Sequence, residues 1–453
     1  MPYIPHTLQD IEEMLKVVGL SSLEELYAQI PSSLRLKKPL DLARGGSEFD
    51  VKKRIEELAA KNITLDKYNS FLGAGCYDHY IPAALPYMLS QPQFLTAYTP
   101  YQAECSQGIL QAIYEYQSYI CLLTGMDVSN ASMFDGASSL AEAVLMALRM
   151  TKRKKVLVAE YLHPEYKETL NTYLSGFDFT IQQVKVADKG ILEKDVLERY
   201  LDDDVVCCCL QSPNFFGLVE NVERVSNTVA SYGAITIMVT NPMSLAILKE
   251  PAELGVDIVC GDGQPLGGSL SFGGPSLGFL AARKKYTRQI PGRIVGKTTD
   301  KETKPAYCLT LQTREQHIRR EKATSNICSN HSLNAIGAAV YLSLMGQQGM
   351  KNVALSSFQN TQYLYQRLKE IRGIKIPYSK QIFNEFIWEV QDAAAVIAKL
   401  YEKNIIAGYF VGRIFPKHKN AILSCCTEKK TKADIDNFIE TLAEVLHGET
   451  TNI

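Results

Sequence analysis

Val205-Val-Cys-Cys-Cys-Leu-Gln211 is the stretch of this 453-residue sequence that decides its fold class. It is an apolar run of strand length, and helical patterns such as Glu165–Ser175 and Ile191–Tyr200 separate several similar runs. Apolar strands that alternate with helices indicate an α/β fold with a mainly parallel sheet covered on both faces. The expected strands are Lys155–Glu160, Phe179–Val186, Val205–Gln211, Ala234–Val239 and Asp257–Cys260.

Two further strands are predicted after this alternating region. They are Ser269–Phe272 and Leu277–Ala282, and the Gly-Gly-Pro sequence between them favours a tight hairpin. A long amphipathic helix is expected before the region, over about Gln107–Thr124.

The N-terminal region is predicted to be a helical arm. Thr7 with Asp10, and Ser22 with Glu25, are each spaced as a capping box, in which two side chains cap the start of a helix. Another helix is expected over about Phe49–Lys61.

Past His331 the pattern indicates a second, smaller α/β domain. Helices are expected at Leu333–Met345, Ser356–Ile371, Ala393–Lys403 and Lys432–Leu446, and strands at Phe383–Val390 and Ala421–Cys426. The sequence therefore predicts a helical arm (1–70), a large α/β domain (71–332) and a small C-terminal α/β domain (333–453).

The composition excludes several classes of function. A net charge of -1 gives no general attraction to nucleic acid or to an anionic membrane. The start MPYIPHTLQD lacks the blocks of a signal peptide, and no apolar run reaches membrane-span length. The 11 cysteines include three in a row and no C-x-x-C pair, which favours free thiols in a reducing cytosol. We therefore expect a cytoplasmic protein. The seven histidines form no metal-binding motif, so no metal site is expected.

A candidate phosphate site lies in the segment Phe134-Asp-Gly-Ala-Ser-Ser-Leu-Ala-Glu-Ala143. Gly136, Ser138 and Ser139 open a predicted helix, and the free N–H groups at the start of a helix suit phosphate. The alternative is a capped helix whose small residues allow tight packing.

Three glycine-containing patterns are excluded as motifs. Gly274-Pro-Ser-Leu-Gly278 resembles a nucleophile elbow, but the residues after it are predicted to be strand rather than helix. Gly292-Arg-Ile-Val-Gly-Lys-Thr298 is one residue short of a phosphate-binding loop, and Gly73-Ala-Gly75 lacks the third glycine of a dinucleotide fingerprint.

Several longer segments together resemble the glycine cleavage P-protein family. The strongest are 99–108, TPYQAECSQG, and 314–328, REQHIRREKATSNIC; segments 71–82, 130–143 and 261–267 are also similar. The resemblance runs through most of the chain, and the length matches the separate alpha-subunit form of the family. It implies the aminotransferase-like fold (fold type I) of pyridoxal-phosphate (PLP) enzymes. It also implies glycine decarboxylation, with transfer of the aminomethyl group to the lipoyl arm of the H-protein.

The expected fold allows a test for the cofactor site. A lysine that holds PLP should follow a late strand, and an acidic partner of the pyridine nitrogen should end an earlier one. Here the strand 234–239 leads to Asn241, which carries no charge, and the strand 257–260 leads to Gln264, which is not an amine. Lys249, Lys284 and Lys285 are the nearest lysines, and none fits an inward-facing position. The chain is therefore expected to hold no PLP of its own.

By resemblance, the cofactor is held by a beta subunit, and this chain contributes to a shared site. The candidates for that shared site are Tyr98, Thr99, Tyr101, Gln102 and Glu104, with subunit packing as the alternative role. Weaker candidates are Phe71, Gly73, His79, Arg319, Arg320 and Lys322. Glu315 stands four residues before Arg319, which indicates a helical ion pair.

Two other functions remain open from the sequence. One is a self-sufficient homodimeric PLP aminotransferase or decarboxylase, which requires a lysine that Gln264 does not supply. The other is a scaffold without catalytic residues that only stabilises its partner.

Overall fold

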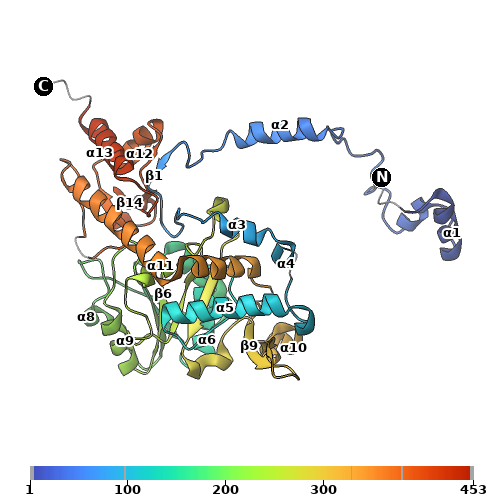
Figure 1. Cartoon of the computed structure of the whole chain (residues 1–453), viewed down its shortest axis with the longest axis horizontal. Coiled ribbons are helices and arrows are strands. Elements are labelled where there is room, and N and C mark those ends of the chain that lie inside the picture. The colour runs from blue at the N-terminus through green and yellow to red at the C-terminus, as the bar shows by residue number, and fades with distance from the viewer. Residues whose placement is uncertain (1–4, 96–97, 328, 379–380, 449–453) are drawn as a thin grey trace. The chain divides into compact units, whose positions relative to one another are not determined.

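The computed structural model describes residues 5–95, 98–327, 329–378 and 381–448. By its internal contacts the chain divides into two units, Met1–Ile63 and Thr64–Ile453 (Figure 1).

The first unit contains the helices α1 (Leu8–Val18) and α2 (Glu48–Ala59) and the short 3-10 helix η1 (Leu23–Tyr27). The capping box of Thr7 and Asp10 is confirmed at the start of α1. The box predicted for Ser22 is wrong, because its side chain does not cap η1. Instead the backbone N–H and the hydroxyl of Ser21 both donate to Glu25.

A seven-stranded sheet forms the centre of the second unit, in the order β2-β8-β7-β6-β5-β3-β4. The strands β4, β3, β5, β6 and β7 are parallel to one another, and β8 is antiparallel to both β7 and β2. Their bounds are β2 Val128–Ser129, β3 Lys155–Ala159, β4 Thr180–Val184, β5 Val205–Gln211, β6 Ile235–Val239, β7 Ile258–Asp262 and β8 Gly278–Ala282. The predicted, mainly parallel sheet is confirmed.

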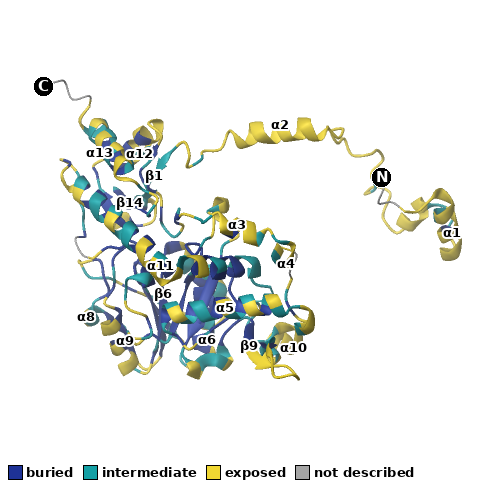
Figure 2. Ribbon diagram, viewed as in Figure 1, coloured by how far each residue is buried: buried dark blue, intermediate teal, exposed yellow. Residues whose placement is uncertain are grey.

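Successive residues of the central strands enter two different cores. Cys208 packs in the core on one face of the sheet, and its neighbours Cys207 and Cys209 pack in the core on the other. This follows from the two-residue period of a strand. The helices α5 (Gln107–Thr124), α9 (Val222–Ser231) and α11 (Ser332–Lys369) cover the first face, and α6 (Gly136–Arg149) and α7 (Pro164–Leu174) cover the second. Figure 2 shows the buried strands between these layers.

A three-stranded antiparallel sheet organises the C-terminal part of the chain. Its order is β11-β14-β13, and α12 (Ala393–Glu402) and α13 (Lys432–His447) pack into the same core. The strands are β11 Glu385–Glu389, β13 Tyr409–Phe410 and β14 Ala421–Cys425. Because α11 contributes Ala335 to the core of the large sheet and Leu364 to this smaller core, it joins the two.

The remaining named helices and strands are short. They are β1 Asn69–Ser70, α3 Ala84–Leu89, α4 Pro92–Leu95, α8 Lys194–Leu197, β9 Ile294–Thr299, β10 Pro305–Thr310, α10 Gln316–Arg319 and β12 Ile405–Ile406. No helix in the described ranges is both long and apolar enough to cross a membrane.

One of the predicted strands differs from the structure. Ser269–Phe272 is not a strand: its end belongs to the 3-10 helix Ser271–Gly273, so β8 pairs with β7 across a long loop rather than in a tight hairpin. The two helices expected between Leu333 and Ile371 both lie within α11, which consists of two helices that meet at a kink at Gly346 (φ 58°), directly after the predicted end of the first helix at Met345.

We expect Leu210→Ala, in the buried centre of β5, to lower the free energy of unfolding by about 2–5 kcal/mol, because the substitution leaves a cavity between packed layers. Leu122→Ala, on the exposed side of α5, should change it by less than about 0.5 kcal/mol. Urea denaturation followed by circular dichroism would measure both. Equal losses would contradict the core described here.

Candidate functional site

A cavity of about 390 Å³ lies at the carboxyl end of the parallel strands, between the end of β7 and the start of α6. Ligands of α/β proteins commonly bind at this edge of the sheet. The lining includes Ala74, Cys76, Asp135, His163, Tyr166, Asp262 and Gln264. We call it the strand-end cavity.

The start of α6 is already occupied by carboxylates of this chain. The N–H of Gly136 donates to Asp262 Oδ2 (3.1 Å), and the N–H of Ser138 donates to Asp135 Oδ1 (2.7 Å). The hydroxyl of Ser139 donates to the carbonyl of Asp135. A Cβ at Gly136 would lie 2.0 Å from Tyr166 Oη, so only glycine allows this close approach of the tyrosine. These groups leave no open cradle for a phosphate.

Asp262 is the residue that holds this arrangement together. Its Oδ1 accepts from the Gln264 N–H (2.9 Å) and from the Ser276 hydroxyl (2.5 Å), while Oδ2 faces α6. Burial raises the pKa of this carboxyl. The three donors and the dipole of α6 satisfy Asp262 in the place that an external anion would need.

Both polar atoms of the Gln264 side chain form hydrogen bonds within the chain. Its Nε2 donates to the carbonyls of Tyr77 and Gly268 (2.8 Å each), and its Oε1 accepts from the N–H of Tyr77 (2.9 Å). The residue is buried. Gln264 therefore clamps a distant backbone segment and has no reactive atom available.

Asn241 also has a structural role. It lies two residues after the end of β6, and its Oδ1 accepts from the Met243 N–H (3.0 Å), which caps the 3-10 helix Pro242–Ala246. Its Nδ2 is buried without a hydrogen-bond partner among the described residues.

No described residue that lines the strand-end cavity is a lysine. Lys249, Lys284 and Lys285 are exposed, and Lys285 pairs with Asp257 instead (3.1 Å). Without a lysine, without a charged residue at Asn241, and with Asp262 bonded to the start of α6, the residues of this chain do not fit a covalently held PLP.

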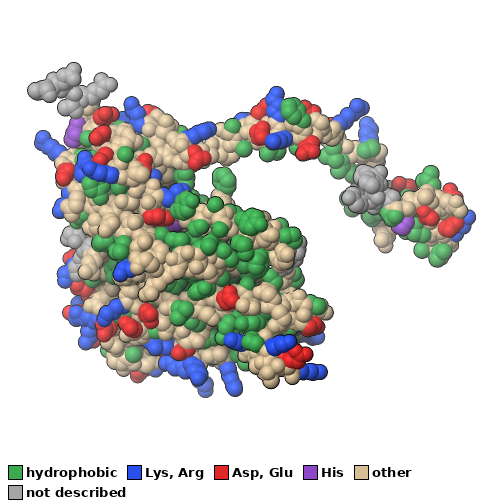
Figure 3. Space-filling view, viewed as in Figure 1, with side chains coloured by type: hydrophobic (Ala, Val, Ile, Leu, Met, Phe, Trp, Pro, Cys, Tyr) green, Lys and Arg blue, Asp and Glu red, His purple; other side chains and the backbone are tan. Residues whose placement is uncertain are grey.

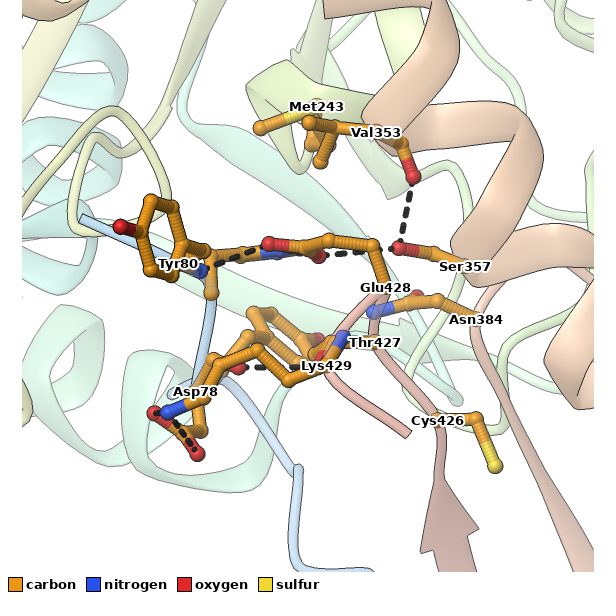
Figure 4. A network of polar contacts seen from close by, with 12 residues as sticks. Asp78, Tyr80, Met243, Val353, Ser357, Asn384, Cys426, Thr427, Glu428 and Lys429 are labelled. Atoms are coloured by element: carbon orange, nitrogen blue, oxygen red, sulfur yellow. Dashed lines mark hydrogen bonds and ion pairs between the residues drawn. The ribbon is translucent and has the colours of Figure 1, made fainter. Parts of the chain in front are cut away.

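The segment 71–83 is also bonded to the residues that follow β14 (Figure 4). Glu428 accepts from the Tyr80 N–H (2.6 Å), and Lys429 Nζ contacts both carboxylate oxygens of Asp78 (2.7 and 2.8 Å). The hydroxyl of Thr427 donates to the carbonyl of Asp78 (2.8 Å). Together with the bonds of Gln264 to Tyr77, these bonds fix the middle of the segment from two sides.

The weaker site candidates of this segment pack against other residues of the same chain. His79 Nδ1 lies 2.7 Å from Glu428 Oε2, and its Nε2 is buried without a partner among the described residues. Phe71 is fully buried against Phe438. A Cβ at Gly73 would lie 2.6 Å from the Cβ of Cys425, so glycine allows the close approach there.

Glu385, on β11, is a buried carboxyl that holds the same segment. Its Oε1 accepts from the Tyr77 hydroxyl (2.6 Å), and its Oε2 accepts from the Ala74 N–H (2.9 Å). Burial raises the pKa of Glu385 to about 7, although both hydrogen bonds oppose this shift.

The shared-site candidates lie on a surface loop before α5. Tyr98, Tyr101, Gln102 and Glu104 are exposed, and Thr99 is half-buried. Tyr98 and Thr99 line a second cavity of about 260 Å³, where the Tyr98 hydroxyl is 3.3 Å from that of Ser329. Tyr101 is exposed, yet its hydroxyl contacts the buried Arg293.

The basic segment after Arg314 is also on the surface, with Arg319, Arg320 and Lys322 exposed. The ion pair predicted between Glu315 and Arg319 is not formed. Because α10 is only four residues long, Glu315 instead pairs with the buried Arg293 (3.4 Å), and Arg319 donates to the carbonyl of Thr313.

Three residues of these sites were not predicted from the sequence to have a role: Asp262, Arg293 and Glu385. Asp262 had a signal, because the glycines on either side of it indicate close backbone approach. A Cβ at Gly261 would lie 2.3 Å from the carbonyl of Thr240. Arg293 and Glu385 have no local signal, since their partners are far away in the sequence.

Comparison with known proteins places these features in a family. The family described as "Glycine cleavage system P-protein" matches residues 1–442. A protein of Carboxydothermus hydrogenoformans, named "Probable glycine dehydrogenase (decarboxylating) subunit 1", is 49% identical over 442 residues, covering 98% of this chain and 99% of that protein. A protein of the same name from Syntrophomonas wolfei is 48% identical and covers 99% of this chain and 100% of its own length.

Solved structures agree with the expected fold type. A glycine decarboxylase (P-protein) of the glycine cleavage system, in inhibitor-bound form, has a TM-score of 0.88 and 39% identity, and covers 98% of this chain and 100% of its own. The glutamate decarboxylase of Lactobacillus brevis has a TM-score of 0.69 at 13% identity over 92% of this chain and 96% of its own, which is a likeness of fold alone. The aminotransferase-like fold of PLP enzymes, predicted by resemblance, is confirmed.

We expect Gln264→Ala to destabilise the chain by about 1–3 kcal/mol for each Tyr77 backbone group that stays buried and unpaired. Gln111→Ala, which removes an exposed glutamine on α5, should cost less than about 0.5 kcal/mol. Urea denaturation of both variants provides the comparison. If Gln264→Ala were as stable as the control, the clamp would not hold the segment.

A second test uses pH. Between pH 4.5 and about 7 the unfolded chain releases the proton of Glu385 while the folded chain keeps it. This carboxyl therefore stabilises the fold fully below about pH 4.5, and its contribution is lost as the pH rises through about 7. The unfolding free energy of the wild type, relative to that of Glu385→Gln, should fall by about 3 kcal/mol over this range. The unfolding free energy of the control variant Glu402→Gln, which changes an exposed residue, should depend on pH in the same way as that of the wild type. Parallel curves for wild type and Glu385→Gln would contradict the raised pKa.

Proposed function

This chain belongs to the glycine cleavage system P-protein family, and we propose that it is the alpha subunit of a two-subunit glycine decarboxylase. The observation that carries the proposal is the bonding of Gln264, whose amide takes the expected place of a cofactor-holding lysine and is fully used by Tyr77 and Gly268. The chain is therefore one part of an enzyme whose cofactor the other part holds.

The partner in this proposal is a beta subunit. PLP held by that subunit stores the electron pair released by decarboxylation. The substrate is glycine, and the aminomethyl group passes to the lipoyl arm of the H-protein. Two alpha–beta pairs form the assembly. The reaction takes place in the cytoplasm, and the unpaired state of the ten described cysteines supports a reducing compartment.

The contribution of this chain to the shared site is the loop that carries Tyr98, Thr99, Tyr101, Gln102 and Glu104. Phenolic and amide groups are suited to ring contacts and to hydrogen bonds with phosphate or carboxylate oxygens. The exposure of Tyr98, Tyr101, Gln102 and Glu104 supports this role, because only exposed groups are available to another subunit.

The apolar surface around α3, α4 and α5 supports a large subunit contact. Tyr87 is 67% exposed, Leu95 57% and Leu122 71%, and Figure 3 shows hydrophobic side chains gathered on this face. Exposed apolar areas of this kind are typical of protein–protein interfaces.

The test begins with the isolated chain. Incubated with PLP, it should show no visible imine absorbance, and borohydride should attach no PLP to any of its lysines, because none of the described lysines lines the strand-end cavity. The beta subunit is the matched control, and it should be labelled. Labelling of this chain at a single lysine would favour a self-sufficient PLP enzyme.

Mixed with the beta subunit, the chain should form a stable complex that exchanges carbon dioxide with glycine in the presence of H-protein. The exchange should fall to background when either subunit is omitted. Full exchange by the beta subunit alone would contradict a shared site and would favour the scaffold role.

A further inference from the structure

Arg293 is a buried arginine whose guanidinium donates a hydrogen bond to an exposed tyrosine. The side chain is 5% exposed, and its Nη2 donates to Tyr101 Oη (2.6 Å). Its Nε lies 3.4 Å from Glu315 Oε2, and its Cζ lies 5.1 Å from the centre of the Tyr101 ring. The contact joins the loop before α5 to the start of β9 and to the start of α10.

This buried pair is only partly satisfied. Arg293 Nη1 and Glu315 Oε1 are buried without a hydrogen-bond partner among the described residues. Such a pair is costly, and apolar residues of similar size are often as stable or more stable. Stability alone therefore does not explain an arginine at this position.

The groups that the pair holds are exposed. Tyr101 is 47% exposed and the side chain of His317 is 46% exposed, and their rings meet edge to face with centroids 5.9 Å apart. His317 Nδ1 also lies 3.6 Å from Glu315 Oε2. The backbone of Arg293 is fixed in turn, because its carbonyl accepts from the Ala131 N–H (2.8 Å).

We propose that Arg293, supported by Glu315, is a positioning residue that fixes the Tyr101 phenol for use at the partner subunit. This inference rests on the proposed function. A guanidinium only donates hydrogen bonds and stays charged at any working pH, so Tyr101 Oη must act as the acceptor. The phenolic proton is then directed away from Arg293 and is available to a group of the partner. Lysine has no planar fork to reproduce this geometry.

A double-mutant cycle in the alpha–beta complex tests the proposal. Tyr101→Phe and Arg293→Met should each lower kcat about tenfold, and the double variant should be no slower than Tyr101→Phe, because Arg293 acts through the phenol. The KM for glycine and the mass of the complex should stay unchanged. Arg293→Lys should recover only part of the loss. The matched control is Arg288→Met, which removes an exposed arginine and should keep full activity.

The outcomes separate this inference from the proposed function. Full activity of Tyr101→Phe, or a loss of about a hundredfold in the double variant, would overturn the coupling. If Tyr101→Phe is slow while Arg293→Met is not, the loop contributes to the site but Arg293 does not position it. If Arg293→Met fails to fold, Glu315→Gln takes its place in the cycle, and losses that multiply with Tyr101→Phe would overturn the proposal. A complex inactive in its wild-type form would contradict the proposed function instead.

Discussion

The two-way hydrogen bond between the amide of Gln264 and the backbone of Tyr77 is the constraint on which the site depends. An amide has a donor and an acceptor side by side, so it can bond the N–H and the carbonyl of one residue at once. A lysine side chain has no acceptor and could not replace it. The bond anchors the segment 71–83 beside β7, and from there Glu385 and Glu428 bind the segment to the C-terminal part of the chain.

The start of α6 follows the same principle. In a fold that positions an anion at a helix N-terminus, the free N–H groups and the helix dipole need a negative group. Here Asp262 and Asp135 supply it from within the chain. The fold therefore keeps its architecture without an external phosphate. Structural side chains have taken over contacts that the fold type otherwise leaves to a ligand, which is a difference of site rather than of fold.

Local pattern in the sequence was sufficient for the parallel strands of the sheet but not for the contacts of the site. The alternation at Cys207 to Cys209 follows from strand geometry alone, and the residue types at Asn241 and Gln264 could be judged by their chemistry. The partner of Gln264 lies 187 residues away, and no local pattern encodes it. Glu315 illustrates the same limit, because its helical spacing to Arg319 predicted a pair that a long-range contact with Arg293 replaces.

In this chain, the internal hydrogen bonding at the strand-end cavity is connected with the fixed orientation of side chains on the surface. The carboxylate of Asp262 and the side-chain amide of Gln264 are bonded internally in the strand-end cavity, and the exposed loop that carries Tyr101 offers polar groups on the surface. Surface loops lose orientation easily, and an active site needs side chains held to within a fraction of an ångström. A buried charge beneath an exposed tyrosine supplies that order at a cost in stability. The unsatisfied atoms of Arg293 and Glu315 are therefore understandable as a consequence of function at a neighbouring subunit.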